Sequence, residues 1–164
     1  ETYADWFRDR LPVTIVRPSN CIGQNQNPKY LAAKLAHAHR ARLPDLTLGN
    51  TAIARDFVDV RDAADIFLQA ILTEDPPPRL NASSGKATEI SELLSTIATI
   101  SGHRPKIRSD PAFFRPGDLM HQACANDLAQ KLGHRPRFGL SDTLQWMLAA
   151  PRTLPKTEQT QVVA

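Results

Sequence analysis

Cysteine, runs of charge and long apolar stretches are all scarce in this sequence of 164 residues. Its two cysteines, Cys21 and Cys124, lie far apart, which argues against a disulfide framework and favours reduced thiols in a cytosolic protein. No apolar run approaches the roughly 18 residues of a membrane span, and no signal-peptide pattern is visible. The five histidines lack metal-ligand spacing, since His37 and His39 would point to different sides of a helix. We therefore expect a cytoplasmic protein with no metal site and no membrane contact.

The charge pattern also disfavours nucleic-acid binding. The formal net charge is only +3, spread along the chain without Lys/Arg runs or interleaved aromatic residues. A mildly basic balance suits a small anionic substrate equally well. With 41% hydrophobic and 23% charged residues, the composition is that of an ordinary globular domain with a core of its own. A basic nucleic-acid binder stays a minor alternative, whose affinity for long duplexes would fall steeply with salt.

The most informative stretch is residues 55–62, with the sequence Arg-Asp-Phe-Val-Asp-Val-Arg-Asp. Its apolar residues favour a strand, and Asp62 can cap a helix that starts at Ala63. A strand end that carries Arg55 and Arg61 beside a helix start can bind an anion. The plainer alternative is that both arginines pair with the three aspartates of the stretch on a solvated loop.

Short apolar runs predict an α/β architecture. Residues 13–16, rich in β-branched side chains, predict a buried parallel strand, and residues 80–83 predict another strand. Ser19 and Asn20 follow the first of these strands, and open parallel sheets bind ligands beyond the carboxyl ends of their strands. The amide of Asn20 can therefore bond a phosphate or a hydroxyl group, or it can simply shape a turn.

Two helix predictions depend on local signals. Pro28 after an asparagine predicts a helix start, because proline favours the first helical position. Tyr3, Trp6 and Phe7 fall at helical spacing and predict a first helix whose aromatic side chains pack into the core.

Five motifs occur in a set order along the chain. They are Leu-Pro-Val-Thr-Ile-Val-Arg-Pro-Ser-Asn-Cys-Ile-Gly at 11–23, the stretch at 55–62, Leu-Asn-Ala-Ser-Ser-Gly at 80–85, Arg-Pro-Gly-Asp at 115–118 and Leu-Gly-His-Arg-Pro at 132–136. Together they resemble the C-terminal half of the extended short-chain dehydrogenase/reductases, the NAD(P)-dependent nucleotide-sugar epimerases, dehydratases and reductases. The run Gly-Gln-Asn-Gln-Asn-Pro at 23–28 looks like the Gly-Pro-Gly-Gln loop of the GDP-mannose 4,6-dehydratase and GDP-4-keto-6-deoxymannose reductase branch, without its proline.

The resemblance implies a fold in two parts, within residues 1–150. One part is the C-terminal portion of a Rossmann-type doubly wound parallel sheet, and the other is a small α+β substrate-binding lobe. The expected pieces are sheet strands near 13–16 and 80–83, lobe segments at 43–60 and 101–148, and a disordered Thr/Gln/Pro-rich tail at 151–164.

The resemblance also implies a diphosphate site. Arg55 and Arg115 would clamp the substrate diphosphate, with Asn20 as a neutral third donor, and Asp118 would accept from the ribose diol. Guanidinium groups match phosphate oxygens in a planar fork that lysine cannot reproduce. Without the resemblance, Arg115 and Asp118 would be interpreted as a surface pair across a turn.

Further roles concern the cofactor and the base. By resemblance, Pro18 and Ser19 would lie at the nicotinamide of NAD or NADP, which the other half of the enzyme would mostly bind. Leu46 and Leu48 share one face of a short strand and would pack against the nucleotide base, although plain core packing is equally compatible with them.

The implied function is the substrate-binding half of an enzyme that transfers a hydride at sugar C4. The family's catalytic Tyr-x-x-x-Lys pair and Gly-rich loop precede residues 1–10, and Tyr3 is followed four residues later by Phe7, so we expect neither in this chain. Glu1 in place of Met agrees with a fragment that is inactive alone and belongs to a homodimeric enzyme. The alternative is a non-catalytic nucleotide-sugar-binding or regulatory module.

Overall fold

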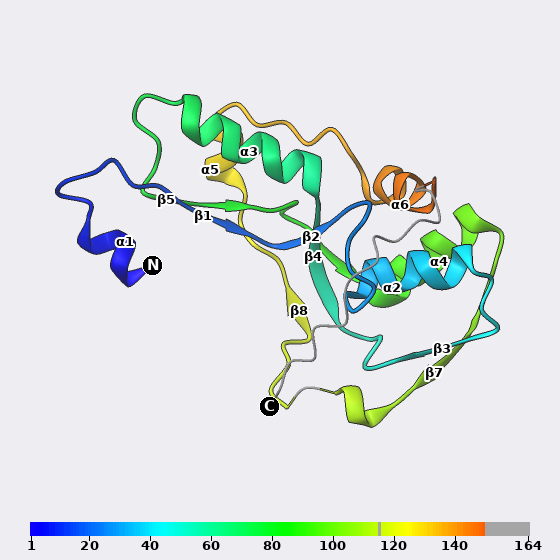
Figure 1. The fold of residues 1–164 in the computed structure, drawn as a ribbon. Helices are drawn as coiled ribbons and strands as arrows, with labels where there is room; N and C mark the ends of the chain where they lie inside the picture. Colours follow the sequence, from blue (N-terminus) through cyan, green and yellow to red (C-terminus); the bar gives the residue numbers. More distant parts are fainter. Residues whose placement is uncertain (115, 150–164) are drawn as a thin grey trace, which may run out of the picture.

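The computed structural model describes residues 1–114 and 116–149, which form an α/β fold (Figure 1). In chain order its elements are α1 (Thr2–Trp6), β1 (Ile15–Pro18), β2 (Asn20–Ile22), α2 (Leu31–Arg40), β3 (Asp45–Leu48), β4 (Ala54–Asp59), α3 (Val60–Leu72), β5 (Arg79–Ala82), β6 (Ala87–Glu89), α4 (Ile90–Ser101), β7 (Lys106–Ser109), the 3-10 helix η1 (Pro111–Phe113), β8 (His121–Gln122), α5 (Asp127–Lys131) and α6 (Leu140–Ala149). Among these residues, no helix is both long and apolar enough to cross a membrane.

Strand β4 joins the parts of the molecule. Its C-terminal half pairs in parallel with β2, while its N-terminal half pairs with the antiparallel β6 and the parallel β8. Strands β1 and β5 form a separate parallel pair, and β3 and β7 form another. Because parallel strands need long crossover connections, helices α2 to α4 fall between them, as in other α/β folds.

Strands β1 and β5 confirm that the chain forms parallel strands near residues 13–16 and 80–83, with shifted bounds. Strand β1 continues through Pro18, and the ladder ends where the amide of Ser19 donates to the carbonyl of Ala82 at 2.9 Å. The predicted burial of β1 is wrong, because Ile15 and Val16 are only half-buried. Among the described residues β5 is its one strand partner, so the other edge of β1 is open.

Two hydrophobic clusters hold these elements together. Helices α2, α4 and α6 pack around Leu35, Leu93, Ile97 and Leu144, none of which has exposed surface. Helix α3 packs on β4 and β5 around Ile66, which is equally buried. In Figure 1, helix α3 lies on one side of β2 and β4, and helices α2, α4 and α6 lie on the other.

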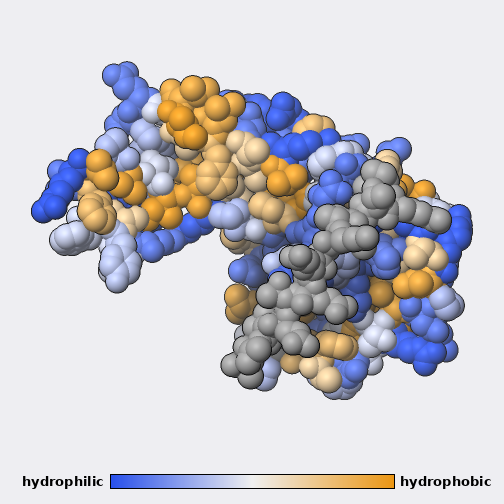
Figure 2. All heavy atoms as spheres, viewed as in Figure 1, coloured by the Kyte–Doolittle hydropathy of each residue, from blue (hydrophilic) through white to orange (hydrophobic). Residues whose placement is uncertain are grey.

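The first helix corrects a prediction about the core. Tyr3, Trp6 and Phe7 are 85%, 66% and 37% exposed, because no other described element packs over the short helix α1. The outer face of α3 is also apolar and exposed, and Figure 2 shows apolar side chains gathered over α3, β1 and β5. Helical spacing indicated an apolar stripe correctly, but spacing alone does not supply the surface that would cover it.

The start of α2 also differs from the prediction. The helix begins at Leu31 and not at Pro28, because the side chain of Asn27 accepts from the amide of Lys29 and holds a local turn. The expected tail at 151–164 lies outside the described residues.

Candidate functional site

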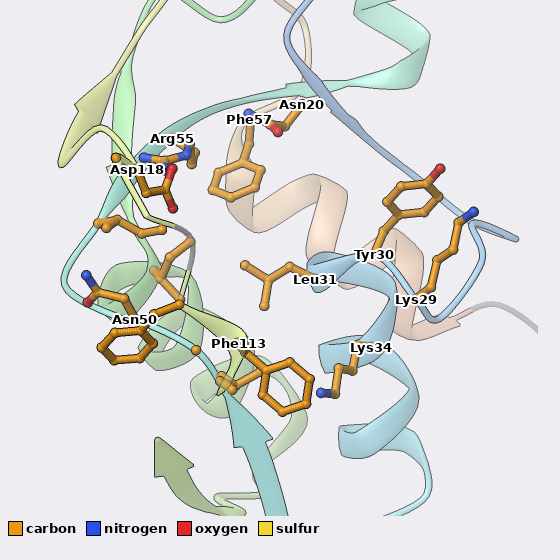
Figure 3. Close-up of a pocket in the computed structure, with 16 residues that line it drawn as sticks. Asn20, Lys29, Tyr30, Leu31, Lys34, Asn50, Arg55, Phe57, Phe113 and Asp118 are labelled. Carbon is orange, nitrogen blue, oxygen red and sulfur yellow. Dashed lines mark hydrogen bonds and ion pairs between the residues drawn. The ribbon is translucent and has the colours of Figure 1, made fainter. Parts of the chain in front are cut away.

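Strand β4 separates two environments because successive side chains of a strand point to opposite faces. Arg55 and Phe57 line a cleft of about 500 Å³ between β4, α2 and the segment that follows β7 (Figure 3). Asp56 and Val58, on the opposite face, are buried at 1% and 3% exposure. The same short sequence therefore supplies one wall of a cleft and part of the interior.

The guanidinium of Arg55 is fixed in position at the cleft wall. Its Nη1 donates to the carbonyls of Ala54 and Leu119, both at 2.7 Å, and its Nη2 donates to Asp118 Oδ1 at 2.5 Å. The alternative that Arg55 pairs with the neighbouring aspartates is wrong, because their carboxylates have other partners. Two of its three contacts are to backbone oxygens, so the main chain supplies most of the hydrogen bonds that hold the guanidinium.

Helix α2 and the residues before it form the opposite wall. Lys29 lies over the ring of Tyr30, with its Nζ 5.1 Å from the ring centre. Lys34 donates from Nζ to the carbonyl of Thr47 at 2.6 Å, which ties α2 to β3. With Arg55, the described lining residues include three cations and one carboxylate, so the cleft attracts anions.

The structure brings most of the predicted binding residues to this cleft. Asn20, Arg55, Asp118 and Leu48 line it, and Asn20 Nδ2 donates to the carbonyl of Asp56 at 2.9 Å. Leu46, on the same face of β3 as Leu48, is buried in the α2–α4–α6 cluster and does not reach the cleft lining. Arg115 lies outside the described residues.

A smaller cavity of about 300 Å³ adjoins the cleft, and the two share Asn20, Tyr30, Leu31 and Phe57 in their walls. Ser19 lines the smaller cavity, whereas Pro18 is exposed at the end of β1. Gln26, which no local motif indicated as a site residue, also lines this cavity, and its Nε2 donates to the carbonyl of Cys21 at 2.9 Å. Gln26 Oε1 is buried and accepts no hydrogen bond from any described residue.

Asp56 is the second feature that the sequence analysis missed. This buried carboxylate accepts five hydrogen bonds, at distances between 2.7 and 3.1 Å. The donors are the hydroxyl of Ser19, the amide and hydroxyl of Ser84, and the amides of Gly85 and Cys124. One side chain thus joins β4, the end of β1, the turn after β5 and the segment before α5.

The other two aspartates of the stretch are also internal. Asp59 caps α3 by accepting from the amide of Arg61 at 2.8 Å, which corrects the prediction that Asp62 caps it from Ala63. Asp59 also accepts from the Arg61 side chain and from the hydroxyl of Thr143. Burial acts to raise the pKa of Asp59, but these hydrogen bonds outweigh it and hold the pKa below its ordinary value.

Asp62 fixes a different segment. Its carboxylate is 2% exposed and accepts from the amides of Arg137 and Phe138, at 3.2 and 3.1 Å. The plainer interpretation is correct for Arg61, which pairs with Asp59. Its solvated loop is wrong, because all three carboxylates of the stretch are buried and each accepts from at least one backbone amide. Within residues 1–114 and 116–149, no three side chains of His, Cys, Asp or Glu come together in a group that could hold a metal ion.

Tyr30 and Lys34 deserve comparison with the family's catalytic pair, because they are spaced as Tyr-x-x-x-Lys. The prediction that the chain lacks this spacing is wrong. However, the pair follows β1, whereas the family's pair precedes residues 1–10. Figure 3 shows the Tyr30 hydroxyl and the Lys34 ammonium pointing away from each other, so they do not form an acid/base pair. A helical spacing next to a predicted anion site was the signal that could have identified both residues as cleft residues.

Comparison with known proteins gives concordant matches. The model of the NAD dependent epimerase/dehydratase family matches residues 2–83. The chain is 29% identical over 127 residues to GDP-6-deoxy-D-talose 4-dehydrogenase of Aggregatibacter actinomycetemcomitans, covering 77% of this chain and 43% of that protein. It is 26% identical over 144 residues to GDP-6-deoxy-D-mannose reductase of Pseudomonas aeruginosa, covering 84% and 47%. The structure of RMD from Pseudomonas aeruginosa complexed with NADPH matches with a TM-score of 0.80 and 22% identity, over 90% of this chain and 51% of that one.

These matches define the fold and the family. The structural match confirms the Rossmann-type α/β fold, and the two relatives named for GDP-sugars agree with the branch that the sequence resembles. The chain spans less than half the length of these two relatives. Since the family model covers half of the chain, from the first helix to the end of β5, the chain belongs to the NAD dependent epimerase/dehydratase family of extended short-chain dehydrogenase/reductases.

Proposed function

We propose that the chain is the substrate-binding half of an NAD(P)-dependent epimerase, dehydratase or reductase that acts on a nucleoside-diphosphate sugar. Residues 43–60 and 101–148 form its substrate lobe. In the complete homodimeric enzyme, bound NAD(P) would supply hydride chemistry at C4 of the sugar, for a reduction or for the first step of dehydration or epimerisation. The GDP-sugar relatives favour GDP as the nucleotide.

One observation carries this proposal: the cleft beside β4 has cationic side chains on two facing walls and a guanidinium held in place by backbone carbonyls. A diphosphate carries about two negative charges, and a preorganised arginine binds its oxygens as a planar fork. A solvated surface cluster would leave Arg55 mobile and would not place Lys29 and Lys34 across a cavity from it.

The neighbouring residues suit the rest of the ligand. We place the diphosphate against Arg55 and Asn20, with Arg115 as the second proposed arginine, and the base against Leu48. Leu46 then supports Leu48 from the core instead of contacting the base. The sugar extends toward the smaller cavity, at the end of β1.

Ser19 fits the proposed nicotinamide position. Its hydroxyl donates to Asp56 at 3.1 Å and keeps its lone pairs, so it can accept from the carboxamide of a nicotinamide. The adjoining Pro18 is exposed at the end of β1 and offers an apolar surface to a planar ring. Ser19 and Pro18 would hold and orient the nicotinamide ring of a bound cofactor at this position.

Calorimetric titration of the chain tests the proposal. We expect GDP-mannose or another nucleoside-diphosphate sugar to bind, while the free nucleoside binds much more weakly because it brings no phosphate to Arg55. NADPH alone should bind weakly, and no nucleotide sugar should turn over, since Tyr30 and Lys34 point apart. Failure of every nucleoside-diphosphate sugar to bind would overturn the proposal.

Turnover distinguishes the enzyme half from the alternative regulatory module. Adding a purified N-terminal half that carries the Gly-rich loop and the Tyr-x-x-x-Lys pair should restore hydride transfer, measured by absorbance of the reduced nicotinamide. Binding of the nucleotide sugar without any restored turnover would favour the non-catalytic module.

A further inference from the structure

Arg55 and Asp118 satisfy each other's charge at the wall of the cleft. The Nη2–Oδ1 distance is 2.5 Å, and the side chains are 13% and 32% exposed. Both residues line the cleft, so the carboxylate lies where Arg55 would meet an oxyanion. Asp118 therefore competes with any phosphate group for the same donor.

The two partners are held very differently. Arg55 has two further contacts, to the carbonyls of Ala54 and Leu119, whereas the ion pair is the one hydrogen bond that the described residues give to the Asp118 side chain. Gly117, just before it, has φ of +73°, and a Cβ there would meet no atom within 4 Å. The Asp118 carboxylate, 32% exposed and held by one hydrogen bond, is therefore displaced more easily than the guanidinium, which keeps two backbone contacts.

We propose that Arg55 and Asp118 form an exchange pair that determines specificity for ligands carrying both a phosphate and a vicinal diol. A phosphate displaces Asp118 from Arg55, and the released carboxylate then accepts from the two ribose hydroxyls. A ligand with a phosphate but no diol breaks the ion pair without that compensation, and a ligand without a phosphate leaves the pair closed.

The exchange builds on the proposed function, since it needs a nucleotide in this cleft. It differs from a simple ribose contact in one respect. If Asp118 only bound ribose, removing its charge would weaken the binding of nucleotides and leave the affinity for inorganic anions unchanged. If it also competes for Arg55, removing its charge must strengthen the binding of an anion that has no ribose.

Calorimetry of the full chain with inorganic pyrophosphate, GDP and 2′-deoxy-GDP separates these cases. Asp118→Asn should bind pyrophosphate about fivefold more tightly than the unmodified chain, because the competing charge is gone. The preference for GDP over 2′-deoxy-GDP should shrink in the same variant. The matched control is Asp45→Asn, which removes one carboxylate from an exposed pair with Arg108 outside the cleft and should leave pyrophosphate affinity within about twofold.

Each result bears on the exchange itself. Unchanged or weaker pyrophosphate binding by Asp118→Asn, with an unchanged melting temperature, would overturn it. Equal tightening by Asp45→Asn would also overturn it, since net charge and not local competition would then explain the gain. Tightening of pyrophosphate confined to Asp118→Asn, in a chain that binds no nucleotide sugar, would keep the competition at Arg55 and reject the proposed function.

Discussion

The two faces of β4 carry charges that are used in opposite ways. On one face, the carboxylate of Asp56 is buried and bound by five donors, three of which are backbone amides. On the other, Arg55 faces a cleft and shares its charge with a half-exposed side chain. A buried acceptor surrounded by donors stabilises the fold, whereas a cation whose one charged partner is half-exposed and replaceable can serve a ligand. The sequence places these two roles on adjacent residues.

The largest expected effect follows from removing the buried carboxylate. Asp56→Ala leaves five donors without their acceptor, so the free energy of unfolding should fall by on the order of 4 kcal/mol, measured by chemical denaturation. Asp118→Ala, on the other face, should lower it by at most about 1 kcal/mol. Similar losses of unfolding free energy for the two variants would contradict the proposed difference between the two faces.

The next effect concerns affinity and not stability. Arg55→Lys loses the planar fork, and binding of the nucleoside-diphosphate sugar should weaken by about 1.5–3 kcal/mol, or one to two decades. The free nucleoside should bind as before. Arg108→Lys, at an exposed pair outside the cleft, serves as the control. If Arg55→Lys lowered the melting temperature while ligand affinity stayed intact, Arg55 would be a structural residue and the proposed function would lose its main support.

Arg61 should contribute to stability, as Asp56 on the buried face of β4 does, and not to ligand binding. Its guanidinium lies between the rings of Phe138 and Trp146, 3.5 and 3.9 Å from their centres, and bonds Asp59. Arg61→Lys cannot stack in this way, so unfolding should become easier by about 1–2 kcal/mol while nucleotide affinity stays unchanged. A loss of affinity with normal stability would place Arg61 with the ligand instead.

The smallest expected effect is a pH dependence that arises away from both faces. Burial, and then the nearby His103, lower the pKa of His39 below its ordinary value of 6.5, and its Nδ1 lies 2.8 Å from the hydroxyl of Ser101. Because the folded pKa is the lower one, this contribution to stability is fully present above pH 6.5 and is lost as the pH falls.

The aspartates do not contribute to the pH dependence in the range where His39 does. The carboxyl pKa values of Asp59 and Asp65 are also lowered, but from 3.8, so they remove stability only at much lower pH. We expect His39→Gln to flatten the fall in melting temperature between about pH 7 and pH 5, whereas the exposed His37→Gln should leave it unchanged. An identical slope for all three proteins would exclude His39 as its source.

Local signals were sufficient for the parts of the site that lie in continuous motifs. The strand that became β4 and the position of Asn20 after β1 follow from short sequences whose order matched a known family. The ion pair between Arg55 and Asp118 was not predicted, because the two residues lie 63 positions apart. Residues 13–16 were also identified as a strand, since a run of β-branched residues is a strong local signal, whereas the short strand β2 was not predicted.

The parts that failed depend on contacts between distant residues. The donors to Asp56 come from the segments around Ser84 and Cys124, so no local pattern could separate it from a solvated acid. The exposure of Trp6 could not be known from its helical spacing, because burial depends on which other element covers it. Lys34 became a cleft residue only when β3 and α2 packed together.

The network at Asp56 has a consequence for how the molecule opens. The amides of Ser84, Gly85 and Cys124 donate to one carboxylate, although the last lies 68 positions from it along the chain. Breaking β4 away from its neighbours would release all of them together. In hydrogen–deuterium exchange, these three amides should therefore become labile as a single cooperative unit, at the same free energy, even though they sit in loops that would otherwise exchange fast and independently.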